Sequence, residues 1–140
     1  MDSPTHEEVQ QWLTKSQRDL KVAWVLFNHE ESLLDSVVYH CQQSAEKSLK
    51  AYLTYQNITF RKTHDLDVLI DLCSLSEPSF QDLKDGADIL TPYATEFRYP
   101  SDTVEPEREE AKEALELASS VLNFVIQSLP DNSNFSMAYE

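Results

Sequence analysis

The chain has 140 residues and a formal net charge of −14 at pH 7. Its length fits one domain with a single core, and its acidic surface repels nucleic-acid phosphates, which excludes broad electrostatic binding to DNA or RNA. Gly86 is the one glycine in the sequence, and this scarcity disfavours tight turns and phosphate-binding loops that need a positive φ. These features favour helices joined by short polar links.

Apolar residues at helical spacing predict two long helices in the first half of the chain. The first runs from about His6 to Asn28, and the second from about Leu34 to Gln56. One stripe of the second helix is expected to face the core. Its members are Val38, Cys41, Ala45, Ser48, Leu49 and Tyr52.

The segment "NITFRKTHD" then interrupts the helical pattern. Thr63 or Asp65 is expected to cap a short third helix from about Leu66 to Leu75, because both residue types accept the free N–H groups of a helix start. A fourth helix is predicted from about Phe80 to Glu96, and Pro92 should kink or divide it, since proline cannot donate the intrahelical bond.

The last predicted helix runs from Pro106 to Leu129 and is strongly amphipathic, with glutamates in its first turns. Residues 131–140 are expected to form a disordered tail, which leaves 1–130 as a single domain. We therefore predict an all-α fold, an antiparallel up-and-down four-helix bundle with one additional short helix.

Other classes of site lack a signal in the sequence. Cys41 and Cys73 form neither a CxxC motif nor a Cys/His cluster at zinc spacing, so no disulfide, metal or cofactor is expected. Motifs of hydrolases, nucleotide-binding loops and metalloproteases are missing. No apolar run approaches the length of a membrane span, and we expect a cytoplasmic protein.

The second helix carries the first candidate ligand contacts. His40, Gln43 and Lys47 are spaced by three and four residues, which places them on one side of the helix, with Lys50 slightly further round. One interpretation is that the lysines hold a phosphate while His40 and Gln43 contact a base or ribose. The alternatives are a solvated face with a Glu46–Lys50 pair, or a buried interface with a second copy or with the other helices, across which Gln42 and Gln43 form hydrogen bonds.

Two further candidates lie outside this helix. His64 is either a titratable group oriented by Asp65 or part of a helix cap. Arg98 stands among aromatic residues, where a guanidinium grips phosphate in bidentate fashion and stacks on rings, or forms a structural ion pair, for example with Glu46.

The stretches "YHCQQSAEKSLKAYL", "KTHDLDVLIDL" and "EFRYP", followed by an alanine-rich last helix, resemble the prokaryotic HEPN domain family over roughly Trp12 to Leu129. This resemblance implies a small helical bundle, a homodimer, and frequent pairing with a small nucleotidyltransferase, sometimes as toxin and antitoxin. Some members are metal-independent ribonucleases that use an arginine followed four to six residues later by a histidine. Here no histidine follows Arg98 within that window.

Three hypotheses follow. The leading one is a non-catalytic protein that binds a nucleotide, a partner nucleotidyltransferase, or both, with ligand contacts from His40, Gln43, Lys47, Lys50, His64 and Arg98. It requires these groups to share one concavity. The second is a metal-independent ribonuclease toxin that uses Arg98 with a histidine from elsewhere, and the third is a purely structural interaction module.

Overall fold

The computed structural model describes residues 3–31, 33–100 and 104–129, and within these ranges every regular element is helical. The prediction of an all-helical fold is therefore confirmed. The elements are α1 (Ser3–Phe27), α2 (Leu34–Tyr55), α3 (Leu66–Ser74), the 3₁₀ turn η1 (Pro78–Leu83), α4 (Lys84–Leu90), the 3₁₀ turn η2 (Thr91–Ala94) and α5 (Arg108–Ser128).

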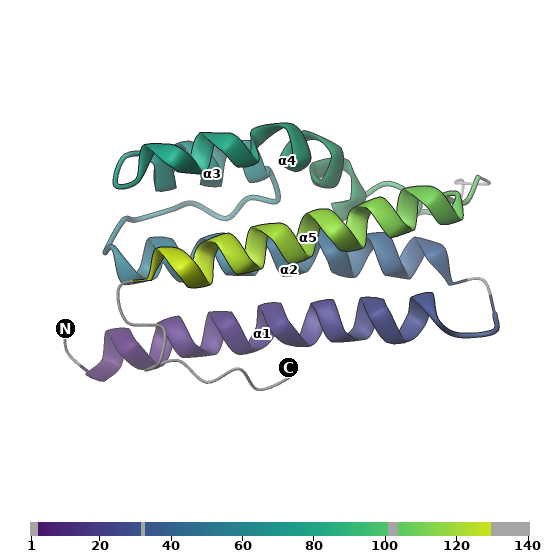
Figure 1. Ribbon diagram of the computed structural model, residues 1–140, viewed down its shortest axis with the longest axis horizontal. Coiled ribbons are helices and arrows are strands. Elements are labelled where there is room, and N and C mark those ends of the chain that lie inside the picture. The colour runs from purple at the N-terminus through teal and green to yellow at the C-terminus, as the bar shows by residue number, and fades with distance from the viewer. Residues whose placement is uncertain (1–2, 32, 101–103, 130–140) are drawn as a thin grey trace.

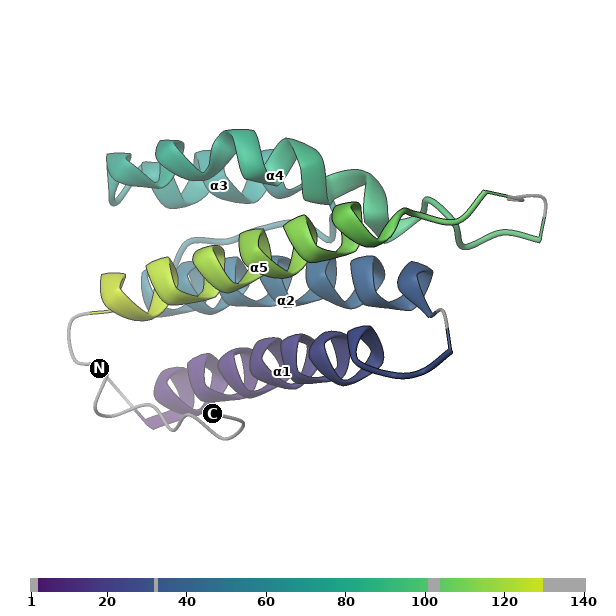
Figure 2. The same ribbon diagram turned by 45° about the vertical axis from the view of Figure 1, so that its right-hand side comes forward.

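Three long helices set the shape of the molecule. Figures 1 and 2 show α2 and α5 in the middle, with α1 on one side and the shorter α3 and α4 on the other. α1 runs antiparallel to α2, whereas α5 runs in the same direction as α2. α2 is in contact with α1, α3, η2, α4 and α5, so it is the helix around which the others pack.

The predicted apolar stripe of α2 lies in this core. Val38, Cys41, Ala45 and Leu49 are fully buried, and Tyr52 is nearly so. The stripe is buried because residues three or four apart share one side of a helix, and α2 has neighbours around most of its circumference. Ser16 on α1 joins the two helices where their backbones approach, since its hydroxyl donates to the carbonyl of Ser44 at 2.7 Å.

Local sequence signals explain where the helices end. After α2, Asn57 takes a left-handed conformation with φ of 57°, and the N–H of Ile58 donates to the carbonyl of Leu53 at 2.9 Å, which closes the helix end. Asp65 caps α3, as predicted, by accepting the N–H of Asp67 at 3.0 Å.

The last helix begins two residues later than predicted. Glu107 is the cap of α5, and its side chain and that of Glu110 form a reciprocal capping box; Pro106 precedes the helix instead of starting it.

The predicted fourth helix, from Phe80 to Glu96, is instead three short pieces: η1, α4 and η2. Pro92 lies in the first turn of η2, in agreement with the predicted break. Phe80, which was expected to begin this helix, lies inside η1 and is fully buried against Tyr52 and Phe124. The Lys84–Leu90 stretch alone keeps α-helical bonding.

The predicted tail, 131–140, lies outside the described residues. Within the part of the chain that the structure describes, no helix combines the length and apolar character needed to cross a bilayer.

Candidate functional site

Two carboxylates organise the polar side of α2, and the first is Asp19 on α1. Its Oδ1 atom lies 2.8 Å from Nδ1 of His40, and its Oδ2 atom accepts a hydrogen bond from Nζ of Lys47 at 2.6 Å. Because His40 and Lys47 are two turns apart on α2, a single carboxylate reaches both. Asp19 thereby fixes two of the predicted ligand contacts in place.

The ionisation of Asp19 follows from these partners. Burial by itself raises the pKa of its carboxyl, but the hydrogen bonds from His40 and Lys47 and their charges outweigh burial, so the pKa lies below its ordinary value. An ionised carboxylate accepts and does not donate, so we assign the ring hydrogen of His40 to Nδ1. The Nε2 atom is then the imidazole's remaining acceptor.

The second carboxylate is Glu46, on α2 itself. Its Oε2 atom accepts from Nζ of Lys50 at 2.8 Å, while Oε1 lies 2.8 Å from Nδ1 of His64 and accepts from Nε2 of Gln42 at 3.2 Å. The amide of Gln42 also donates to the backbone carbonyl of His64 at 2.9 Å, and the Gln43 amide donates to Oε1 of Gln42 at 2.8 Å. We call these five residues the Glu46 network.

The Glu46–Lys50 pair is buried, so the alternative of a solvated ion pair is wrong for these two residues. Glu46 is 4% exposed and Lys50 is 8% exposed. Nζ of Lys50 lies 5.5 Å from the ring centre of Trp12 and 5.9 Å from that of Phe60. Burial raises the pKa of Glu46, but the hydrogen bonds from Lys50 and His64 outweigh it and the net shift is downward.

Arg98 is held by an aromatic ring. Its guanidinium carbon lies 3.8 Å from the ring centre of Tyr39, and the Tyr39 ring lies edge-on to that of His40 at 5.2 Å. The preceding residue, Phe97, has a φ of 67°, a left-handed backbone conformation that residues other than glycine rarely adopt. The Phe97 ring stacks on the ring of Tyr93, with the ring centres 6.3 Å apart. The suggested ion pair between Arg98 and Glu46 does not form, because Glu46 binds Lys50 and His64.

The six predicted contacts therefore do not surround one centre. His40 and Lys47 bind Asp19, and Arg98 lies close to them through Tyr39. Gln43, Lys50 and His64 belong to the Glu46 network. His40 and Lys50 are ten positions apart, which corresponds to about 15 Å along a helix. One elongated side of α2 thus carries two clusters.

Sequence reasoning missed Asp19 and Tyr39. Asp19 follows Trp12 by seven residues, two helical turns, and so shares its side of α1. A carboxylate next to apolar helix positions is rarely buried without a cation, and this was the available signal. Tyr39 gave no such signal, because an aromatic residue beside an apolar stripe is most simply part of the core.

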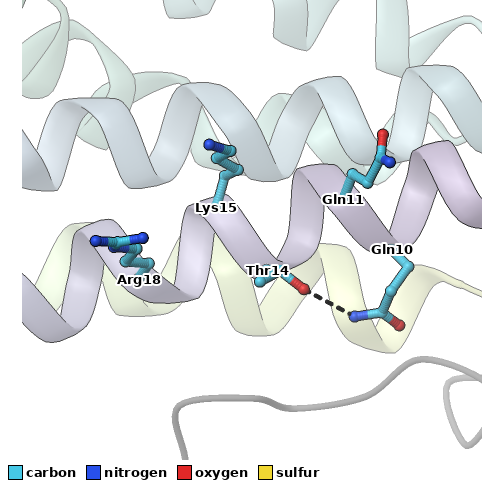
Figure 3. Close-up of a pocket in the computed structure, with 5 residues that line it drawn as sticks. All are labelled: Gln10, Gln11, Thr14, Lys15 and Arg18. Carbon is cyan, nitrogen blue, oxygen red and sulfur yellow. Dashed lines mark hydrogen bonds between the residues drawn. The ribbon is translucent and has the colours of Figure 1, made fainter.

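A hollow of about 210 Å³ lies elsewhere, along α1 (Figure 3). The described side chains that line it all project from this one helix and include none of the predicted contacts. They are Gln10, Gln11, Thr14, Lys15 and Arg18. Among the described residues, no group of three or more histidine, cysteine, aspartate or glutamate side chains is arranged to hold a metal ion.

Comparison with known proteins identifies the family. The family model named HEPN domain matches residues 9–129, which is most of the chain. The chain belongs to the HEPN domain family. This HEPN protein is similar to the crystal structure of TT1696 from Thermus thermophilus, at 26% identity and a TM-score of 0.69, over 86% of this chain and 98% of that one.

A second solved structure, ST0689, is described as an archaeal HEPN homologue. It is 26% identical to this HEPN protein with a TM-score of 0.64, over 85% of this chain and 95% of that one. Among curated proteins, none matches the chain.

Proposed function

We propose that this HEPN protein binds a nucleotide through its phosphate groups, has no catalytic activity of its own, and acts in the cytoplasm of a prokaryote as the homodimeric partner of a small nucleotidyltransferase, in a toxin–antitoxin-like pair. Family membership supports the partner and the dimer. The phosphate contacts rest on the side chains around Tyr39. The proposal assigns them to His40, Lys47 and Arg98, and leaves Gln43, Lys50 and His64 to the Glu46 network.

One observation carries this proposal: a local excess of cationic groups in a chain of net charge −14. Lys47 and Arg98 are basic side chains, and His40 is a third group of this cluster that can carry a positive charge. Among the described residues, Asp19 is the one carboxylate paired with this group. Arg98 itself is exposed and has no carboxylate partner among these residues.

The contacts leave donors available for a phosphate. Stacking on Tyr39 occupies the face of the Arg98 guanidinium, whereas its N–H groups project from the edge, where they match two phosphate oxygens. The ammonium of Lys47 has three donors, of which Asp19 takes one. The Tyr39 ring also offers an apolar surface next to these donors.

Calorimetric titration with ATP and other nucleotides tests the proposal. Arg98→Ala and Lys47→Ala should each weaken binding about tenfold or more, which is the loss of one charge-assisted hydrogen bond. Arg61→Ala is the matched control, because Arg61 is an exposed arginine outside the cluster. If no nucleotide binds, or if Arg61→Ala weakens binding as much as Arg98→Ala, the nucleotide part of the proposal fails. Co-purification with a nucleotidyltransferase from an adjoining gene tests the partner part.

A second candidate function is metal-independent ribonuclease activity, and the geometry of His40 favours it. Its Nδ1 is bound to Asp19 and its Nε2 is left as an acceptor, which is how a carboxylate orients an imidazole for general base catalysis. Arg98 reaches this region through Tyr39, where a guanidinium would stabilise a pentavalent phosphate. Cleavage of RNA in excess EDTA by the purified protein, and its loss in His40→Ala, would support an enzyme; intact RNA with both proteins would exclude it.

A further inference from the structure

A second hollow lies near Lys50, at the end of the polar side of α2 away from Tyr39, and its lining is cationic. It measures about 380 Å³, and its described lining consists of Lys50, Lys62, Thr63 and His64. Each of these side chains carries a hydrogen-bond donor, and none of them is a carboxylate. Three of the four come from the irregular segment between α2 and α3, and Lys50 comes from α2.

The Glu46 network holds two of these donors in position. Glu46 accepts one hydrogen bond from the Lys50 ammonium, and the rings of Trp12 and Phe60 lie within 6 Å of the same nitrogen, at 5.5 Å and 5.9 Å. These contacts fix the position of the Lys50 ammonium in the lining of the hollow, with 10% of its side chain exposed.

His64 and Thr63 are oriented by contacts on their other sides. Nδ1 of His64 binds Glu46, so Nε2 is the ring nitrogen left for a ligand, and 63% of the side chain is exposed. The Thr63 hydroxyl oxygen accepts the N–H of Asp65 at 3.1 Å, which leaves its hydrogen free to be donated. The Asp65 carboxylate is engaged elsewhere, since it accepts the N–H of Asp67.

We propose that this hollow binds a phosphate group, either as free phosphate or as the phosphoryl end of a nucleotide. Lys62 supplies positive charge, Lys50 adds N–H donors beyond the one that Glu46 accepts, and the Thr63 hydroxyl donates to a phosphate oxygen. His64 presents Nε2 to the hollow, because its Nδ1 is bound to Glu46. The proposal goes beyond the nucleotide contacts at Tyr39 and does not depend on them.

The lining distinguishes this hollow from its neighbour. Trp12 and Phe60 also line a hollow of about 330 Å³, whose described wall includes Glu8 and otherwise uncharged residues. A carboxylate without a lysine in that wall disfavours an anion. We therefore place the phosphate at Lys62 and His64. The rings of Trp12 and Phe60 contribute only by packing against Lys50.

The test is a titration of the full chain by ¹H–¹⁵N NMR with three probes: inorganic phosphate, 5′-AMP and adenosine. We expect phosphate and AMP to shift the backbone signals of residues 62–64, and adenosine to leave them unchanged. Lys62→Ala should raise the Kd for inorganic phosphate about tenfold. Lys112→Ala is the matched control, because it removes the same charge from an exposed position on α5, and it should bind phosphate like the wild type.

The variants separate this site from the one at Tyr39. Arg98→Ala should leave the phosphate shifts at residues 62–64 intact, and that result supports the proposal whatever happens to nucleotide binding elsewhere. Tighter AMP than phosphate binding would identify a nucleotide end as the source, and equal affinities would identify free phosphate. The proposal is overturned if phosphate causes no shifts at these residues, or if Lys62→Ala and Lys112→Ala weaken binding equally.

Discussion

Replacing Glu46 by alanine should destabilise the fold far more than the loss of an ordinary ion pair. The side chains of Glu46 and Lys50 are 5% and 10% exposed. Removing the carboxylate leaves a buried ammonium without a counter-charge, which costs about 3–5 kcal/mol. The Trp12 and Phe60 rings continue to stabilise the cation by about 1–2 kcal/mol. We therefore expect the unfolding free energy to fall by about 3 kcal/mol, the lower end of the range for an unpaired buried charge.

Urea unfolding followed by far-ultraviolet circular dichroism measures this loss. Asp71→Ala is the control, because the Asp71–Lys84 pair has a similar distance, 3.0 Å, but side chains that are 58% and 34% exposed. That variant should lose less than about 1 kcal/mol. Equal losses for Glu46→Ala and Asp71→Ala, at unchanged denaturant dependence, would show that burial of the network does not determine its strength.

Acid provides an independent check on the same network. The folded protein holds the pKa of Glu46 below its ordinary value of 4.5, so the network's contribution is present above that pH and is lost as the pH falls through the folded pKa. The difference in stability between wild type and Glu46→Ala should therefore shrink in acid. A difference that stays constant from about pH 7 to about pH 3 would contradict the ionised state of Glu46.

Three further predictions concern other parts of the molecule. Burial and the neighbouring Asp88 raise the pKa of Asp67 to about 6, so the Asp67 carboxyl should destabilise the fold increasingly as the pH rises from about 4 to above 6, and Asp88→Asn should reduce that dependence in urea unfolding. Gly86→Ala should leave the stability unchanged or raise it by up to about 1 kcal/mol, because alanine gains helix propensity and the added Cβ would lie 2.9 Å only from the far end of the half-buried Leu117 side chain, which can shift. The Cys41 thiol is fully buried and its pKa is raised by burial, so it should react with a thiol reagent only after unfolding.

Each of these has a result that would contradict it. An NMR titration that finds an ordinary pKa for Asp67 would remove the basis of the acid-pair prediction. A Gly86→Ala variant clearly less stable than wild type would mean that the Leu117 side chain cannot move aside. Reaction of Cys41 in the native protein at the rate of a small-molecule thiol would show that the core opens locally.

The fold was predictable because it depends on periodicity and caps. The α2 stripe followed from spacing alone, and the cap at Asp65 followed from residue type. The fourth helix was predicted as one element because Phe80 and the residues after it have helical spacing. Buried contacts of Phe80 with Tyr52 and Phe124, distant in sequence, accompany the 3₁₀ bonding that replaces it.

The sequence identified polar residues of α2 that take part in the site, but not the residues that they bind. Helical spacing correctly placed His40 and Lys47 on one side of α2. It gave no information about Asp19, which lies 28 residues before Lys47 in the chain and meets it only through the packing of α1 on α2. The division into two clusters likewise depends on where the segment before α3 crosses α2, and that path is a tertiary property.

The position of Lys50 against Trp12 has a practical consequence. An indole's emission wavelength responds to nearby charge, so this side chain acts as a built-in optical reporter of the adjoining hollow. Trp24 stands apart on the surface side of α1, 40% exposed and edge-on to Phe27. Replacing Trp24 by phenylalanine would leave Trp12 as the single tryptophan, which can be excited apart from the tyrosines, and occupancy near Lys50 could then be followed in unlabelled protein at low concentration.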